Sequence, residues 1–293
     1  MFGALATTLC FALTPVFANR AAHRLGSSAA NFWRLAVALV ALGVWAHVFG
    51  PGFGGAAKGW FFSGGLAGFG IGGLAMFQSL PRLGSNLSTL IVQCGSALAA
   101  AVLEWAWLGT ALTPLQVACI ALTLAGVTLG LSPRSLPRVS PTEWTIGLAW
   151  AVLSAAGQGV GAVLSRKAFG VARVLHEPID AGTAAYLRAV AGLLVAALAW
   201  GFVCWRGMDQ PRATGRAWPW VLANTLTGPI LGVVCFQWAL RTTPAGIVQA
   251  VVATSPLLII PFAARFEHTR PRPIYFLGAG LAVTGVVGLI LGL

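Results

Sequence analysis

Ten apolar segments, each about as long as a membrane-spanning helix, occupy almost the whole chain of 293 residues. The hydrocarbon core of a bilayer is ~30 Å thick, so a helix that crosses it needs ~20 apolar residues. We place the expected spans at residues 3–19, 31–49, 60–80, 85–107, 114–131, 145–165, 184–205, 218–240, 244–264 and 273–293. The sequence therefore predicts an all-α integral membrane protein that crosses a bacterial inner membrane or a plasma membrane ten times.

The composition fits a membrane environment. Hydrophobic residues make up 58% of the chain and charged residues 8%, whereas soluble domains average about 45–50% and 25%. The net charge of +12 is spread over short loops and helix ends, where basic side chains meet lipid phosphates, and no basic run is dense enough to follow a nucleic-acid backbone. The five cysteines lie inside apolar segments without the spacing of a metal site. We therefore expect a lipid bilayer and a small-molecule substrate as partners, with no nucleic acid, metal or other cofactor.

The second half of the chain repeats the first in degenerate form. An offset of 159 residues aligns polar residues and prolines without gaps from the third expected span to the fifth. The aligned positions include Phe77-Gln78 with Phe236-Gln237, Arg82 with Arg241, Ser96 with Ser255, Pro114 with Pro273, and Gly126-Val127 with Gly285-Val286. We divide the chain into a first five-helix repeat at 1–131, a polar linker at 132–144 and a second five-helix repeat at 145–293.

An odd number of helices in each repeat fixes their relative orientation. After five crossings the second copy enters the membrane from the opposite side, so the two copies become inverted repeats. That architecture places a binding site near the midplane between the halves, opened alternately to each side. Because one chain supplies both halves, we expect a monomer.

Several motifs resemble the ten-helix EamA-type exporters of the drug/metabolite transporter superfamily. The carrying residues are Phe32-Trp33-Arg34, Tyr186-Leu187-Arg188, Pro244-Ala245-Gly246, Ser255-Pro256-Leu257, Glu267 and Gly278-Ala279-Gly280 with Gly285. The first repeat departs from the pattern, with Ala97 in place of the proline and Glu104 displaced toward the membrane. The resemblance implies export of small metabolites, amino acids including aromatic ones being the nearest analogy.

The two indications of topology disagree. Arginines concentrate in the odd-numbered loops, which the positive-inside rule assigns to the cytoplasm, with both termini outside. The family resemblance implies that both termini lie in the cytoplasm instead.

The function predicted is secondary transport, in which small neutral or zwitterionic metabolites, foremost amino acids, are exported by alternating access around a central cavity. The alternative is another cargo class, such as a drug, a nucleotide-sugar or a phosphate ester. A channel or an intramembrane enzyme is the remote alternative. We predict no enzyme, because the expected spans hold no paired aspartates, no Ser–His pair and no HExxH motif.

Polar residues inside apolar spans are the candidates for substrate binding, because an unpaired polar group in hydrocarbon costs several kcal/mol. The predicted set is Gln78, Gln237, Asn224, Thr227, Pro229, Ser96 and Ser255, with Trp33 and Trp238 as stacking surfaces for an aromatic cargo. Packing between helices is the competing interpretation for each of them. Glu104, the one carboxylate clearly inside a span, is the candidate for proton coupling, against an interfacial pairing with an arginine.

Arg34 and Arg188 occupy equivalent places in the two repeats, a turn inside their helices. They could recruit an anionic substrate. The sequence favours a structural role instead, in which the long side chains reach the membrane interface or cap carbonyl groups.

Overall fold

The computed structural model describes residues 1–131, 139–207, 217–258 and 273–291, and every regular element in these ranges is a helix. Eight helices are long and apolar enough to cross a membrane, and two shorter apolar helices, Pro114–Gly130 and Ala245–Leu258, coincide with two further expected spans. The all-helical membrane fold is confirmed. The count of ten crossings stays a prediction.

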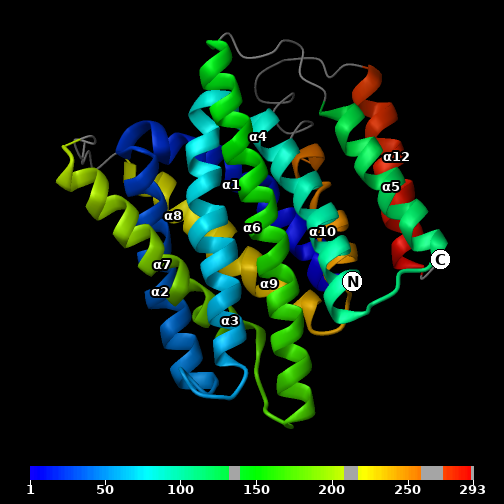
Figure 1. The fold of residues 1–293 in the computed structure, drawn as a ribbon, viewed down its shortest axis with the longest axis horizontal. Coiled ribbons are helices and arrows are strands. Elements are labelled where there is room, and N and C mark those ends of the chain that lie inside the picture. The colour runs from blue at the N-terminus through cyan, green and yellow to red at the C-terminus, as the bar shows by residue number, and fades with distance from the viewer. Residues whose placement is uncertain (132–138, 208–216, 259–272, 292–293) are drawn as a thin grey trace.

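Figure 1 shows the helices in their order along the chain. The first half contains α1 (Phe2–Leu25), α2 (Ser27–Phe49), α3 (Lys58–Gly65), a π-helical turn (Leu66–Gly72), α4 (Gly73–Leu103), a second π-helical turn (Glu104–Leu108) and α5 (Pro114–Gly130). The second half contains α6 (Pro141–Val174), α7 (Ala181–Trp205), α8 (Trp218–Thr225), a π-helical turn (Leu226–Ile230), α9 (Leu231–Leu240), α10 (Ala245–Val252) and α12 (Pro273–Ile290).

Local sequence signals set two of the boundaries. Helix α4 is broken at Gly84, whose φ of 77° is in the left-handed region that glycine adopts readily, and this break separates the third span from the fourth. Helix α6 begins at Pro141 behind Ser140, whose hydroxyl accepts from the backbone N–H of Glu143. It therefore starts four residues before the expected span and continues to Val174. Residues 132–138 of the expected linker lie outside the described ranges.

Corresponding helices of the two halves run antiparallel. The C-terminal part of α2 meets the beginning of α7, where Trp45 Nε1 donates to Asp180 Oδ1 at 2.9 Å. At the opposite edge of the molecule α5 and α12 lie side by side (Figure 1). A Cβ on Gly126 would lie 2.6 Å from the carbonyl oxygen of Gly278, and one on Gly285 would lie 2.6 Å from that of Cys119. Contacting residues therefore run in opposite chain order, as inverted repeats require.

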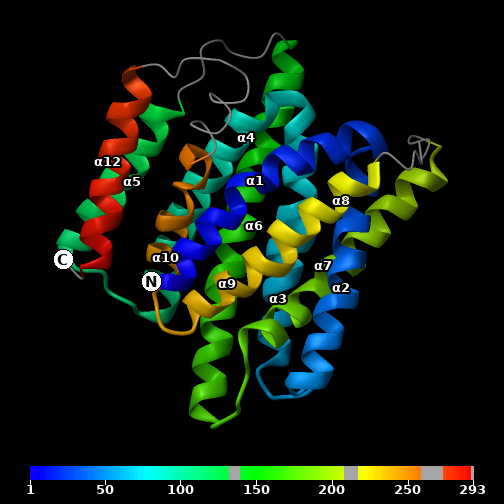
Figure 2. The ribbon, with the colours of Figure 1, turned by 180° about the vertical axis from the view of Figure 1, so that it is seen from behind.

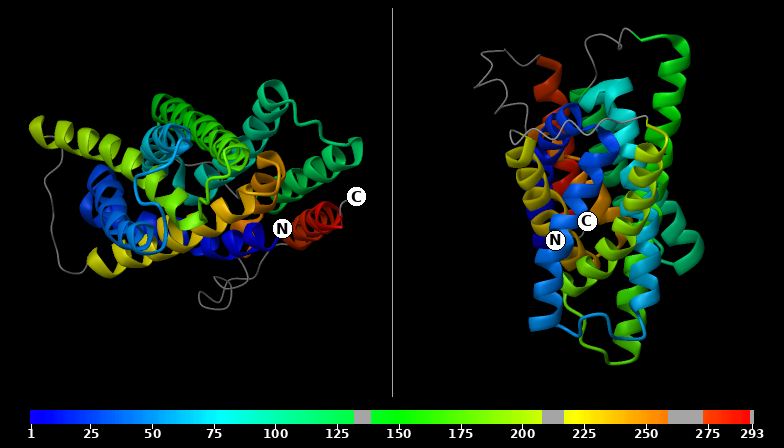
Figure 3. Two further views of the ribbon diagram at one scale, coloured as in Figure 1. Left: turned by 90° about the horizontal axis from the view of Figure 1, so that it is seen from below. Right: turned by 90° about the vertical axis from the view of Figure 1, so that its left-hand side faces the viewer.

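The first helix of each half packs against the third span of the other half. Helix α1 packs against α8 and α9, and α6 packs against α3 and the π-helical turn Leu66–Gly72 (Figure 2; Figure 3). With α4 and α10 these helices form the middle of the bundle, while α2–α7 and α5–α12 lie at its two edges. The arrangement brings both repeats around one central space.

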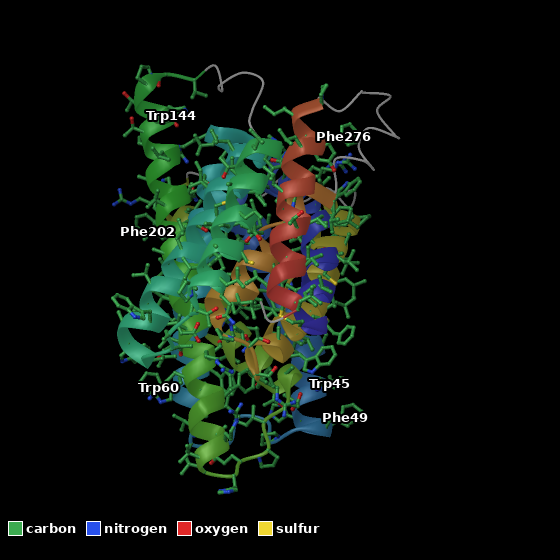
Figure 4. All side chains as sticks on the ribbon, turned by 90° about the vertical axis from the view of Figure 1, so that its right-hand side faces the viewer. Trp45, Phe49, Trp60, Trp144, Phe202 and Phe276 are labelled. Atoms are coloured by element: carbon green, nitrogen blue, oxygen red, sulfur yellow. The ribbon has the colours of Figure 1, made fainter. Side chains whose placement is uncertain are left out.

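Aromatic side chains mark the two ends of the bundle. Trp45, Phe49 and Trp60 lie toward one end, and Trp144 and Phe276 lie toward the other (Figure 4). Phe49 is 70% exposed and Phe276 61% exposed. Aromatic rings at both ends of an apolar bundle are typical of the two membrane–water interfaces.

Candidate functional site

A cavity of about 130 Å³ lies between the two halves. Its walls come from α1, α2, the third and fourth spans, α6, α7, the eighth span and α10. The lining residues are Phe11, Thr14, Pro15, Ala18, Arg34, Gly68, Phe69, Gly73, Met76, Phe77, Thr89, Val92, Gln93, Gln158, Arg188, Gly228, Pro229, Val233, Phe236 and Gln249. The cavity thus has the location that inverted repeats predict for a binding site.

Two π-helical turns face this cavity from opposite halves. Leu66–Gly72 contributes Gly68 and Phe69, and Leu226–Ile230 contributes Gly228 and Pro229. The offset of 159 residues carries the first turn onto 225–231, so the two are equivalent in the repeats. Such turns interrupt the regular hydrogen-bond ladder and recur at functional sites. Pro229 adds to the interruption because it has no N–H to donate.

Arg34 on α2 is 8% exposed and lines the cavity. Its Nε donates to Asn31 Oδ1 at 3.0 Å, one turn earlier on the same helix. Its guanidinium carbon lies 4.9 Å from the ring centre of Phe77, close enough for a cation–π contact. Neighbouring groups hold the side chain in the bundle, although none of these contacts supplies a negative charge.

Arg188 on α7 is 4% exposed and lines the cavity from the other half. Its Nη1 donates to the carbonyl oxygen of Gly161 at 2.6 Å and to the hydroxyl of Ser165. Its guanidinium carbon lies 5.5 Å from the ring centre of Phe69. Its Nε is buried with no partner among the described residues.

The electrostatics of the cavity are one-sided. No lining residue is acidic. Within the described ranges the ion pairs are Arg82–Glu143 and Arg166–Glu104, and neither involves a lining arginine. A charge removed from water costs several kcal/mol unless it is paired. Among the lining residues there are thus two guanidinium groups and no carboxylate.

The remaining lining is a mixture of apolar surface and neutral hydrogen-bonding groups. Gln93 Nε2 donates to Ser255 Oγ at 3.4 Å, and Gln158 Nε2 donates to Ser154 Oγ at 3.2 Å. In each of these glutamines the amide oxygen has no partner among the described residues, and it is free to accept from a ligand ammonium. Gln249 from α10 adds a third amide.

The structure places the predicted polar residues at different distances from the cavity. Pro229 lines it directly. Thr227 hydrogen-bonds the lining residue Thr14, with 3.1 Å between the hydroxyl oxygens, and Ser255 bonds Gln93 as described above. Ser96 is fully buried, and its hydroxyl donates to the carbonyl of Gln93 in the same helix at 3.0 Å.

The other predicted binding residues lie outside the lining. Gln237 and Asn224 are fully buried, and their side-chain amides have no partner among the described residues. The backbone carbonyl of Gln78 accepts from Arg82 Nη1 at 2.8 Å. Trp33 joins an aromatic cluster with Phe32, Trp200 and Trp218, and Trp238 is 52% exposed. Their roles in binding stay predictions.

Glu104 lies in a structural network away from the lining. Its Oε2 accepts from the backbone N–H groups of Ala245 at 2.6 Å and Gly246 at 3.3 Å, at the beginning of α10. Its Oε1 is 3.7 Å from Arg166 Nε, and Arg166 Nη1 donates to the carbonyl of Leu240 at 3.0 Å. These contacts join the fourth, sixth, eighth and ninth spans, and the role in proton coupling stays a prediction.

Among the lining residues only Pro229 belongs to the predicted set, and four of the others occupy equivalent places in the two repeats. Arg34 and Arg188 were assigned a structural role, and Phe77 and Phe236 were passed over in favour of the glutamines that follow them. The signal was present, because both pairs occupy equivalent places in the two repeats. What the sequence lacked was the direction in which each side chain points.

A helical bundle that crosses the membrane many times, with a cavity between two antiparallel halves, is the architecture of a secondary transporter. The sequence profile of the EamA-like transporter family matches residues 1–131 and 145–291, so the chain belongs to that family. It is thus a multi-pass membrane transporter of the drug/metabolite type.

Other comparisons agree with the fold. One protein of known crystal structure, 19% identical, superposes with a TM-score of 0.70 over 99% of this chain and 94% of its own. At that identity the likeness concerns the fold alone. No curated protein matches the chain by sequence.

Proposed function

We propose that this chain exports small neutral or zwitterionic metabolites, foremost amino acids, by alternating access around the central cavity. The observation that carries the proposal is the composition of the cavity wall, to which both repeats contribute equivalent residues, Arg34 with Arg188 and Phe77 with Phe236. A rocking motion of one half against the other would expose such a shared wall to each side in turn.

The chemistry of the wall suits an amino acid. A guanidinium group pairs with an α-carboxylate in a bidentate geometry, and the amide oxygens of Gln93, Gln158 or Gln249 accept from an ammonium. Phe11, Val233 and Phe236 offer apolar surface to a side chain. A cavity of about 150 Å³ holds a benzene molecule, so the volume here suits a compact metabolite.

The test is uptake of labelled phenylalanine into proteoliposomes, compared with protein-free liposomes, without an imposed ion gradient. We expect saturable uptake that unlabelled amino acids compete away. Phe236→Ala should reduce uptake at least about tenfold, if the lost contact is worth ~1.4 kcal/mol or more. Phe276→Ala is the matched control, since Phe276 is 61% exposed on the outer face of α12.

The proposal would be overturned by uptake no faster than in protein-free liposomes for a full panel of amino acids, with and without a proton gradient. The family assignment would survive that result, and the cargo would then belong to the alternative classes of drugs, nucleotide-sugars or phosphate esters.

A further inference from the structure

The two cavity arginines converge on one short stretch of the third span. A Cβ built on Gly68 would lie 2.7 Å from Arg188 Nη2, and one built on Gly73 would lie 3.1 Å from Arg34 Nη2. These glycines are five residues apart, at the π-helical turn Leu66–Gly72 and the residue that follows it. Glycine at both places lets the guanidinium groups lie directly against the helix backbone.

This convergence puts the charges deep in the bundle. Gly68 and Gly73 flank the middle of the span Lys58–Gly84. Arginines that reach the interface carry their guanidinium groups toward a helix end, and these two carry them toward the centre. The structural role favoured from the sequence therefore does not account for their position.

Local contacts leave much of each guanidinium group unsatisfied. Each carries five N–H donors. In the described part of the chain Arg34 donates through Nε alone and Arg188 through Nη1 alone. Cation–π contacts of ~0.5–2 kcal/mol with Phe77 and Phe69 are smaller than the cost of burying an unpaired charge. An anion in the cavity would supply the missing acceptors.

We infer that the cargo is a small dianion whose two acidic groups, carboxylate or phosphate, each pair with one of the two arginines. The inference rests on the proposed transport by alternating access and changes the expected cargo from a neutral or zwitterionic metabolite to one with two acidic groups. Two acidic groups can pair with both guanidinium groups, whereas a zwitterion with one carboxylate leaves one guanidinium group without a negative partner. Both guanidinium groups lie against one short stretch of the third span, so a compact molecule with two acidic groups could reach both of them.

Matched ligands test the charge requirement directly. Aspartate and asparagine have nearly the same shape and differ by one negative charge, and succinate removes the ammonium. Phosphoglycolate replaces one of the two carboxylates by a phosphate and so distinguishes phosphate from carboxylate. We expect aspartate, succinate or phosphoglycolate to raise the melting temperature of the detergent-purified protein and to be taken up by proteoliposomes. Asparagine should bind at least about tenfold more weakly than aspartate, because it loses one charge-assisted pair.

Arginine variants connect that preference to the site. Arg34→Gln and Arg188→Gln should each lower dianion uptake at least about tenfold and reduce the discrimination between aspartate and asparagine. Arg206→Gln is the matched control, because Arg206 is exposed at the end of α7, the helix that carries Arg188. Arg34→Lys keeps the positive charge but loses the planar guanidinium group. It should therefore discriminate between aspartate and asparagine better than Arg34→Gln and less well than the wild type. A variant that merely misfolds would lower uptake of every ligand and would not change the ratio.

The outcomes separate this inference from the proposed function. Equal uptake of aspartate, asparagine and phenylalanine would overturn the dianion inference and leave amino-acid transport standing. Dianion binding in detergent without uptake of any ligand would support the site and overturn transport. Neither binding nor uptake of any of these ligands would overturn both.

Discussion

At the residue scale, the absence of a side chain at Gly68 makes room for a charge. The position that a methyl group would take lies 2.7 Å from Arg188 Nη2, inside contact distance. The guanidinium group is the end of the flexible Arg188 side chain. A methyl group at position 68 would therefore displace it while the backbone stays in place. We therefore expect the position of the Arg188 guanidinium group to depend on the absence of a Cβ atom at Gly68.

Gly68→Ala should therefore impair transport without unfolding the protein. We expect uptake to fall about tenfold or more, given a clash that costs ~1–3 kcal/mol, while the melting temperature in detergent stays within a few degrees. Gly59→Ala on α3 is the control, because nothing lies within 4 Å of its added methyl group. Full transport by Gly68→Ala would show that the position of Arg188 does not matter.

Asp180 links the ends of two helices from different repeats. It caps α7 by accepting from the backbone N–H groups of Gly182 and Thr183, and it also accepts from Trp45 on α2. Burial alone would raise the pKa of this carboxyl group. The hydrogen bonds from Thr183, Trp45 and Gly182 outweigh burial and hold the pKa below its usual value.

A lowered pKa makes the contribution of Asp180 to stability dependent on pH. The charged form is stabilised in the fold, so the contribution is full above the unfolded value of about 4 and is lost as pH falls through the lowered value. Asp180→Ala should lower the unfolding free energy by about 1 kcal/mol at pH 7. This difference between the variant and the wild type should become smaller near pH 3. Thermal unfolding at both pH values measures this. A difference of the same size at pH 3 would contradict the lowered pKa of Asp180.

At the scale of elements, glycines set the approach of α5 to α12. Gly126→Ala would put a methyl group 2.6 Å from the carbonyl oxygen of Gly278, a backbone atom that cannot swing aside. We expect a loss of about 1–3 kcal/mol, measured by thermal unfolding in detergent. Gly280→Ala on α12 meets nothing within 4 Å and should leave stability unchanged. Equal melting temperatures for the two variants would mean that these helices do not depend on close contact.

Glu104 joins elements rather than facing the cavity. Its carboxylate accepts from the first N–H groups of α10 and lies 3.7 Å from Arg166 Nε. Glu104→Gln should lower stability by about 1–3 kcal/mol because Arg166 loses its buried partner, and the pH dependence of uptake should not change. Unchanged stability together with an altered pH dependence would assign the residue to proton coupling instead.

For the whole molecule, the cavity is complete within one chain. Both halves line it, so no second copy is needed to form the site. We predict a monomer, with a detergent-corrected protein mass of 30.3 kDa in light scattering after gel filtration. A stable dimer mass over a range of protein concentrations would refute this.

Much of the architecture could be predicted because it depends on local composition. Long apolar segments form helices that must satisfy their own backbone in lipid, and Pro114 or Pro141 marks a helix start within a few residues. The π-helical turn at Leu226–Ile230 coincides with the polar cluster expected around Pro229. Its partner at Leu66–Gly72 carried no polar residue and was not foreseen.

The site was harder to predict, because a repeat match does not give the direction of a side chain. The pair Phe77-Gln78 aligns with Phe236-Gln237, and the structure turns the phenylalanines, not the glutamines, into the cavity. Neighbouring residues on a helix point ~100° apart, so which of them faces the centre depends on how the helix is rotated against its neighbours.

The sequence by itself determined that this chain is a helical membrane protein made of two related halves in opposite orientation, since those properties depend on apolar length and on an odd helix count. Only the tertiary structure decided what occupies the centre. Arg34 and Arg188 meet the third span near its middle because glycines there leave space for two guanidinium groups. That juxtaposition depends on packing between segments far apart in the chain, Arg34 with Gly73 and Arg188 with Gly68, which no local pattern encodes.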